Sequence, residues 1–237
     1  MKRPVALCLL VLSCLGSRVL FCQEPSVRVG GTAAWFAPVG ALSVRFLPTV
    51  GGSVHFALKR GVPQWGGSIE YFKFHRENID KLFITRTLTD SLTGAQNTFR
   101  FPLQQLSMSL EMIGVAANGS YELWNNEFIE TRFCFGFGVY HWKGARSSYY
   151  DSVKVQMSKG PVLVEVLRVP ENQQEDWSGG LNVGAEVSLR ILSPLSLNLG
   201  GRYRIIVGEL WPALALDIEN VSSFQMVELR AGFSVDF

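Results

Sequence analysis

Strict alternation of apolar and polar residues is the feature of this sequence that most constrains its fold. In the segment 225–237, apolar side chains fill the odd-numbered positions from Val227 to Phe237, whereas most even-numbered positions are polar or small. The same pattern recurs over 129–140, 181–191 and 195–207. Successive side chains of a β-strand point to opposite faces, so each segment predicts a strand with one apolar and one polar face.

Four earlier segments alternate less regularly and bring the predicted strands to eight. They are 27–35, 50–59, 68–72 and 105–112. Eight antiparallel strands joined in order can close into a barrel, which removes the unpaired edges that promote aggregation. We therefore predict an all-β fold, an eight-stranded antiparallel up-and-down barrel.

The first residues have the composition of a secretory signal peptide. Lys2 and Arg3 precede the uncharged apolar stretch 5–15, which is shorter than the ~20 residues that a membrane-spanning helix needs. Gly16, Ser17 and Cys22 are each small enough to precede the cleavage site, and we favour cleavage after Cys22. The expected domains are a signal peptide, 1–22, and a barrel domain, 23–237. Cys134 is then the one cysteine of the mature chain, which excludes an intramolecular disulfide and a cysteine metal site.

The predicted connections alternate between short and long. Those near 60–64, 117–127 and 192–194 are short to moderate and contain turn residues, including Asn118 and Gly119 in the second. Those near 37–48, 76–104, 143–177 and 208–222 are longer. Short periplasmic turns and long extracellular loops are typical of transmembrane β-barrels.

Alternation alone does not decide which face of the barrel points outward, because a soluble barrel packs its apolar face inside. Arginine and glutamate, rather than lysine, dominate the polar faces, and these residues suit paired and partly dry sites. Aromatic residues also lie near predicted strand ends, where a membrane barrel carries its interfacial girdles. These aromatic residues are Trp35, Tyr71, Trp142, Tyr203 and Phe237. Both observations favour a transmembrane barrel with its apolar face against lipid.

The charged residues of the predicted inner faces are nearly balanced in sign and form the main candidate site. They are Arg28, Glu70, Glu111, Glu130, Arg132, Glu186, Arg190, Arg202, Arg204, Glu228 and Arg230. An eight-stranded barrel is just wide enough for side chains to fill it, and buried charges must pair. We predict a network of ion pairs that plugs the lumen. The alternative is a narrow channel lined by solvated charges.

Two segments resemble small bacterial outer-membrane barrels. The ending Ala231–Phe237, AGFSVDF, resembles the C-terminal signal of outer-membrane proteins, and the stretch Phe133–Trp142, FCFGFGVYHW, resembles strands of the outer-membrane-protein A and W type. The resemblance implies an integral outer-membrane protein surrounded by lipid. It also implies that the barrel-assembly machinery reads the apolar residues Phe233, Val235 and Phe237.

The sequence contains no motif that indicates catalysis, a cofactor or a metal site, and its net charge of +2 argues against nucleic-acid binding. His141 near Ser147 or Ser148 is the weak case for a lipid-modifying enzyme, and we predict no enzymatic activity. The apolar loop around Trp211 and Leu214 could cap the barrel mouth or admit an apolar ligand. The expected function is structural or surface-interacting, with a narrow porin-like channel for small or apolar solutes as the alternative. The sequence names no ligand for the long loops.

Overall fold

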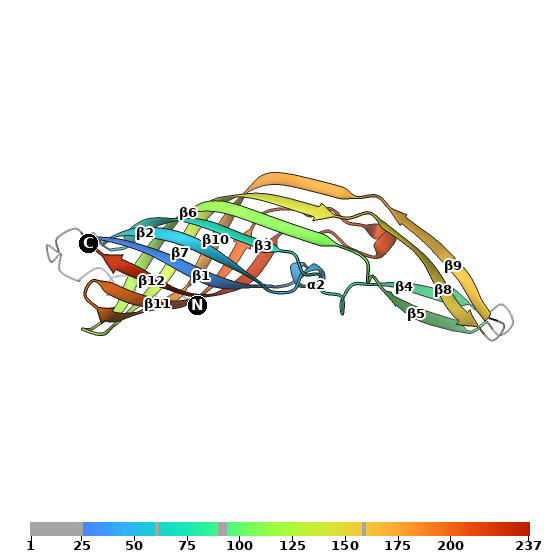
Figure 1. Cartoon of the computed structure of the whole chain (residues 1–237), viewed down its shortest axis with the longest axis horizontal. Helices are drawn as coiled ribbons and strands as arrows, with labels where there is room; N and C mark the ends of the chain where they lie inside the picture. The colour runs from blue at the N-terminus through green and yellow to red at the C-terminus, as the bar shows by residue number, and fades with distance from the viewer. Residues whose placement is uncertain (1–25, 60–61, 90–93, 158–159) are drawn as a thin grey trace, which may run out of the picture.

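The computed structural model describes residues 26–59, 62–89, 94–157 and 160–237, and it confirms the predicted eight-stranded antiparallel barrel (Figure 1). The barrel strands are β1 (Ser26–Pro38), β2 (Thr49–Lys59), β3 (Gln64–Phe74), β6 (Met108–Asn125), β7 (Ile129–Arg146), β10 (Asn172–Leu192), β11 (Leu195–Ile206) and β12 (Phe224–Asp236). The predicted signal peptide, 1–22, lies outside the described residues.

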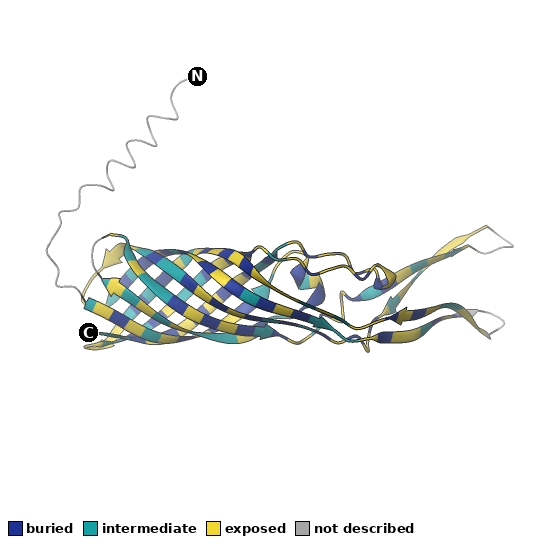
Figure 2. Cartoon of the chain, turned by 90° about the horizontal axis from the view of Figure 1, so that it is seen from above, coloured by how far each residue is buried: buried dark blue, intermediate teal, exposed yellow. Residues whose placement is uncertain are grey.

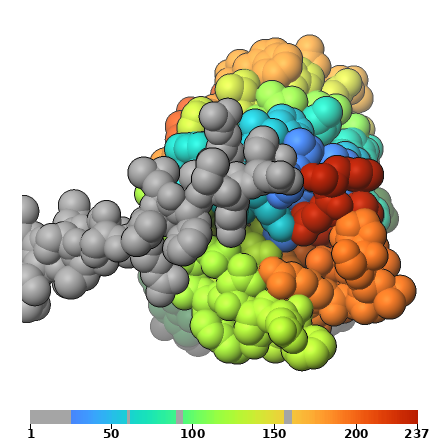
Figure 3. All heavy atoms as spheres, turned by 90° about the vertical axis from the view of Figure 1, so that its left-hand side faces the viewer, coloured from blue at the N-terminus to red at the C-terminus, as the bar shows by residue number. Residues whose placement is uncertain are grey.

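The barrel closes because β1 and β12 pair along their whole length. Their register places Ala33 opposite Ala231, and each other barrel strand pairs with its neighbours in chain order. The short turns 126–128 and 193–194 lie at one end of the barrel together with Ser26 and Asp236. Figure 3 looks onto this end and shows the β6–β7 turn and the β10–β11 turn beside the end of β12.

The turn predicted around Asn118 and Gly119 is wrong, because both residues lie within β6. Asn118 pairs with Gly136, and its amide donates a hydrogen bond to Ser68 Oγ (2.9 Å). A Cβ atom at Gly119 would overlap the ring of Phe135 on the neighbouring strand. The Asn-Gly pair therefore serves side-chain packing inside a strand, and the chain turns later, at 126–128.

The two longest loops contain hairpins that project from the other end of the barrel (Figures 1 and 2). One pairs β4 (Phe83–Thr89) with β5 (Gln96–Pro102), and the other pairs β8 (Tyr149–Met157) with β9 (Gly160–Val169). The apolar run 162–169 thus extends a hairpin beyond the barrel. The loop after β11 carries the short 3-10 helix η1 (Leu214–Leu216), and the loop after β1 carries α2 (Leu42–Arg45).

The barrel interior has two layers of opposite polarity. In the half nearer the termini, charged and polar side chains point inward and apolar ones outward, and exposed and buried residues alternate along each strand (Figure 2). In the half nearer the hairpins, most inward-facing residues are apolar and buried, and polar ones such as Arg146 and Gln174 lie at the mouth. The apolar ones include Phe36, Phe72, Phe74, Met108, Leu110, Met112, Phe224 and Met226. We call these eight residues the apolar layer.

Two predictions of outward orientation are corrected by this second layer. Alternation predicts that the apolar side chains of 105–112 face lipid, but Met108, Leu110 and Met112 are buried inside the barrel. Trp142, expected in an interfacial girdle, is 4% exposed and donates its indole N–H to Ser178 Oγ (2.8 Å). Both segments lie where the strands lead into the hairpin region, so the inside of the barrel is the apolar surface there.

No helix among the described residues is long and apolar enough to cross a membrane.

Candidate functional site

The candidate site is the network of charged side chains in the lumen. Nine of the eleven predicted residues lie there, at the even-numbered, inward-facing positions of six strands, and each is at most 8% exposed. They are Arg28, Glu70, Glu130, Arg132, Glu186, Arg202, Arg204, Glu228 and Arg230. Alternation over successive strand positions brings these residues together, because it sends every second side chain into the lumen.

Arg204 is the centre of the part of the network that lies nearest the hairpins. Its guanidinium group bonds Glu70, Glu228 Oε2 (2.8 Å) and the hydroxyl of Tyr140 (2.7 Å). Ser68 Oγ adds a hydrogen bond to Glu70 Oε1 (3.0 Å). Arg204 has no exposed surface, so its charge is paired with Glu70 and Glu228 rather than solvated by bulk water.

Arg204 also marks the boundary between the two layers of the interior. Its guanidinium carbon lies 5.8 Å from the ring centre of Phe36 and 6.0 Å from that of Phe72. At this distance a cation is attracted to the face of an aromatic ring. The ion pairs therefore lie directly against the apolar layer.

Arg28 organises the part of the network nearest the termini. Its Nη2 atom bonds Glu130 Oε2 (2.8 Å), and its Nε atom bonds Asp236 Oδ1 (2.7 Å). Lys59 Nζ also bonds Asp236, at 2.6 Å. Alternation places Lys59 and Asp236 on polar faces, but their positions at strand ends gave no reason to include them in the predicted site.

Two ion pairs join strands on opposite sides of the barrel. Going round the barrel, β1 and β7 are four strands apart, and so are β11 and β3. The pair between Arg28 and Glu130 joins the first two strands, and that between Arg204 and Glu70 joins the other two. In a barrel of eight strands, four steps are half of the circumference, so these side chains meet across the lumen.

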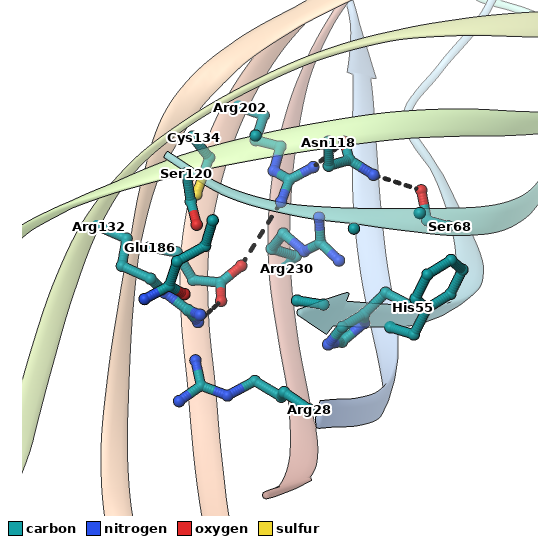
Figure 4. Close-up of a pocket in the computed structure, with 16 residues that line it drawn as sticks. Arg28, His55, Ser68, Asn118, Ser120, Arg132, Cys134, Glu186, Arg202 and Arg230 are labelled. Atoms are coloured by element: carbon teal, nitrogen blue, oxygen red, sulfur yellow. Dashed lines mark hydrogen bonds and ion pairs between the residues drawn. The ribbon is translucent and has the colours of Figure 1, made fainter. Parts of the chain in front are cut away.

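The middle of the network surrounds a small cavity (Figure 4). Glu186 pairs with Arg132 and lies 3.6 Å from Arg202, while Arg230 donates to Thr32 Oγ1 (3.2 Å). The cavity has a volume of about 50 Å³, and its lining includes Cys134 and His55. A space of this size and polarity suits a few ordered waters. The thiol of Cys134 is buried in its wall, where a small side chain leaves room for the arginines.

Glu111 and Arg190 do not belong to the lumen, which corrects the prediction. Glu111 lies on the outward face of β6, beside the apolar layer, where its half-exposed carboxylate pairs with Lys73 Nζ (3.0 Å). Arg190 is exposed at the end of β10, where it donates to the carbonyl of Asn126 (2.8 Å) in the β6–β7 turn. The prediction is wrong for Glu111 because the inward face of its segment is the apolar one. It is wrong for Arg190 because this residue lies at the end of its strand, outside the lumen.

The structure does not bring together the histidine and serine considered for catalysis. His141 lies on the outer face of β7 against Trp177, with ring centres 5.0 Å apart. Ser147 Oγ instead accepts the backbone N–H of Ser107 (3.1 Å). Among the described residues, no group of three or more His, Cys, Asp and Glu side chains is arranged to hold a metal ion.

The outer face of the barrel is an apolar belt between aromatic side chains. Exposed aliphatic and aromatic residues cover its middle, among them Val54, Phe56, Ile69, Val115, Phe137, Leu181 and Leu229. Trp35, Tyr71, Trp177 and Tyr203 are exposed towards the hairpin end, and Trp65, Tyr121, Trp124 and Phe237 towards the end with the termini. A closed barrel with an apolar belt, aromatic girdles and a charged lumen in the half nearer the termini is a transmembrane barrel of the outer membrane. Because such barrels carry their long loops outside the cell, we expect the hairpins to lie on the extracellular side.

The chain matches no protein-family model, and no curated protein matches it by sequence. Its fold is similar to several solved bacterial outer-membrane proteins. A major outer membrane protein from Thermus thermophilus superposes with a TM-score of 0.48 at 11% identity, covering 91% of this chain and 100% of that one. Neisserial surface protein A gives 0.45 at 14% identity, covering 90% and 100%. OprG from Pseudomonas aeruginosa gives 0.42 at 9% identity, covering 91% and 97%.

These superpositions are distant in both sequence and shape. The description of this chain as a small outer-membrane barrel therefore rests on its own closed barrel, its apolar belt and the charged lumen of the half nearer the termini.

Proposed function

We propose that this protein is a non-enzymatic outer-membrane barrel with a structural or surface-interaction role, whose lumen does not conduct ions. The observation that carries the proposal is the stacking of two different obstructions in one lumen. The ion pairs between opposite strands cross it in the periplasmic half, and the apolar layer fills it in the extracellular half.

The ion pairs support a closed lumen because separating them would cost a large free energy. Arg204 and Glu70 are almost completely buried, and a solute that separated them would leave two unpaired charges away from bulk water. An eight-stranded barrel has an interior that its own side chains fill. The ion pairs between opposite strands therefore also fix the distance between these strands across the barrel.

The apolar layer supports the same proposal by a different mechanism. Phe72, Met112, Phe224 and Met226 are each at most 1% exposed, so the space between them is packed. A hydrated ion entering this layer would lose its water and gain no polar partner, and apolar constrictions block conduction in this way.

The extracellular hairpins support a role in surface interaction. Arg86 links β4 to β9 through Glu165 (2.7 Å) and to the last loop through Asp217 (3.1 Å), so three extracellular segments are tied together. Large apolar side chains remain exposed on the second hairpin, among them Tyr150, Val162, Leu163 and Val166. Exposed apolar patches of this kind often mark contacts with other molecules.

Planar-bilayer recordings test the closed lumen. We expect no stable unitary conductance from the wild-type protein. The fourfold substitution Phe72→Ala, Phe224→Ala, Arg28→Ala and Arg204→Ala should produce conductance steps, because it removes both the centre of the apolar layer and the ion pairs that cross the lumen. The matched control is Phe133→Ala with Phe137→Ala, which removes two rings from the outer face. Stable steps from the repurified wild-type protein would contradict the proposal.

The second candidate function is a narrow channel for small solutes, and the polar cavity around Arg132 and Glu186 favours it. Such a channel would need the apolar layer to move aside. Wild-type conductance that falls after Arg132→Gln, with the apolar layer intact, would favour this candidate.

We also propose that the barrel-assembly machinery reads the outward row Phe233, Val235 and Phe237. Phe233 and Phe237 are 55% and 76% exposed, on the lipid side of the strand that closes the barrel. Phe237→Ser should lower the amount of assembled protein in the outer membrane. Phe128→Ser, at an exposed aromatic residue of the β6–β7 turn, is the control. Equal assembly of both variants would contradict this role.

A further inference from the structure

A second polar site lies at the extracellular mouth of the barrel, apart from the lumen network. It is a cleft between α2, the loop after β11 and the inward faces of β6, β7 and β10. Its lining includes Arg45, Arg146, Gln174 and Trp211. Its lining places the cleft where β7 ends and β10 begins, at the base of the second hairpin.

The cleft contains two arginines with no acidic partner. Among the described residues, no carboxylate lies within 4.0 Å of a guanidinium nitrogen of Arg45 or Arg146, whereas Arg28, Arg132 and Arg204 in the lumen each have one. Glu77 approaches the same wall, but its Oε1 accepts the backbone N–H of Met108 (2.6 Å). Two positive charges therefore remain uncompensated at close range.

The hydrogen-bond partners of these arginines are backbone carbonyls. Arg45 Nη2 donates to the carbonyls of Trp211 (3.1 Å) and Glu219 (2.5 Å), and Arg146 Nη2 donates to that of Pro170 (3.1 Å). These bonds fix both side chains in place, so the cleft is organised before any ligand enters. Preorganised donors bind an anion without first having to become ordered.

Three further donors in the cleft have no partner. They are the Nε atoms of Arg45 and Arg146 and the amide nitrogen of Gln174, and all three are buried. The amide of Gln174 is oriented by its oxygen, which accepts the backbone N–H of Trp211 (3.1 Å). Buried polar groups are almost always satisfied, and here every unsatisfied atom of the cleft is a donor. The missing partner is therefore an acceptor.

Burial makes the charge of Arg45 costly. The side chain is 7% exposed, and burial, followed by the nearby charge of Arg146, lowers its pKa to about 10. Arg45 thus remains a cation at neutral pH although its surroundings disfavour the charge. An anion in the cleft would relieve both the desolvation and the repulsion.

We propose that this cleft binds the phosphoryl group of a soluble extracellular ligand. A phosphoryl group offers several acceptor oxygens and close to two negative charges, which match the three free donors and the two arginines. Inorganic phosphate is the simplest probe of this chemistry. A lipid headgroup fits less well, because the cleft is lined by inward faces of the strands and not by the lipid-facing belt.

The test is calorimetric titration of the full detergent-solubilised protein with inorganic phosphate. We expect saturable binding that weakens roughly tenfold or more in Arg45→Gln and in Arg146→Gln, because each loses charge-assisted hydrogen bonds. Arg168→Gln is the matched control, since it removes an exposed extracellular arginine that stacks on Tyr150. Heat-modifiable gel migration shows that each variant is folded, and Arg146→Gln decides the matter if Arg45→Gln disturbs the loops.

Several outcomes would overturn the proposal. They are no phosphate binding by the wild-type protein, equal weakening in Arg168→Gln, or acetate binding as tightly as phosphate. Phosphoryl binding seen only on vesicles that contain phosphatidic acid would overturn the assignment to a soluble ligand.

Discussion

The periplasmic and extracellular halves of the barrel use the same backbone with opposite side-chain rules. On β6, Val115 points outward into the apolar belt, while Glu111, two outward positions away on the same face, pairs with Lys73 in the open. Inward positions change just as sharply, from Ser68 and Glu70 to Phe72 and Phe74 along β3. Strand geometry makes side chains alternate between the two faces in both halves. The surrounding medium, lipid or water, determines whether the outward-facing residues are apolar or polar.

Each half is consequently stabilised by a different interaction. The apolar outer face of the periplasmic half contacts lipid, so the hydrophobic effect does not favour its burial inside the protein. This half is stabilised instead by backbone hydrogen bonds between strands and by ion pairs that compensate its inward charges. The extracellular half is surrounded by water and gains from burying apolar area, as a soluble domain does. The following substitutions test this division, from the largest expected effect to the smallest.

Removal of Arg204 should have the largest effect. Arg204→Met leaves Glu70 buried without an ion-pair partner and Glu228 with only Arg230, 3.8 Å away, and breaking a buried ion pair in this way costs about 3–5 kcal/mol of the free energy of unfolding. Urea unfolding in lipid vesicles measures it. Arg190→Met is the control, because that arginine is exposed at a turn and should change little. Adding Glu70→Gln and Glu228→Gln to Arg204→Met should recover most of the loss, and a triple variant as unstable as the single one would refute this account.

A cavity in the apolar layer comes next. Leu110 is completely buried, and Leu110→Ala should cost roughly 2–5 kcal/mol through lost burial and the cavity that remains. Leu229→Ala makes the same change on the lipid face, where lipid fills the space, and should cost clearly less. Equal losses in vesicles would mean that the two halves do not differ as described.

The sequence predicts the strands well where one medium surrounds the whole element. For the segments 181–191 and 195–207 it predicts the correct faces, because lipid lies outside and the polar lumen inside. For the segment 105–112 it predicts that the apolar face points outward, whereas in the structure it points inward. Alternation has the same period in water and in lipid, so it does not show which medium surrounds the segment. The lumen charges could be found by position alone, which is why nine of eleven lie inside.

The remaining features depend on contacts that the sequence does not encode locally. Lys59 meets Asp236 through the closure of the barrel, 177 residues apart in the chain. Arg45 and Arg146 come together because the loop that carries α2 folds over the barrel mouth, where Arg146 ends β7, and neither residue lies in a motif. The strands of the first hairpin alternate only over short runs, such as Phe99 and Phe101 on either side of Arg100, so the sequence does not single them out as strands.

The lipid boundary itself can be located with a pair of substitutions on one face of β6. Val115→Arg places a charge in the apolar belt and should cost about 2–4 kcal/mol, whereas Ser109→Arg lies beyond it and should cost at most about 1 kcal/mol. Both residues occupy odd-numbered, outward positions, so backbone and strand are matched. Urea unfolding in vesicles gives both values. If Ser109→Arg were as harmful as Val115→Arg, the extracellular half would also be embedded in lipid.

The smallest effect is expected at the junction of the extracellular segments. Arg86 is partly exposed in its ion pairs with Glu165 and Asp217, so Arg86→Gln should cost only about 0.2–1 kcal/mol per pair, because water screens them. The loss should appear as faster hydrogen exchange at amides of β4 and β9, with the exchange of the barrel strands unchanged. Arg100→Gln is the control, since Arg100 stacks on Phe83 and has no ion pair among the described residues. Faster exchange throughout the barrel would mean that the hairpins and the barrel unfold as one unit, and that the two halves are coupled more tightly than their separate interiors imply.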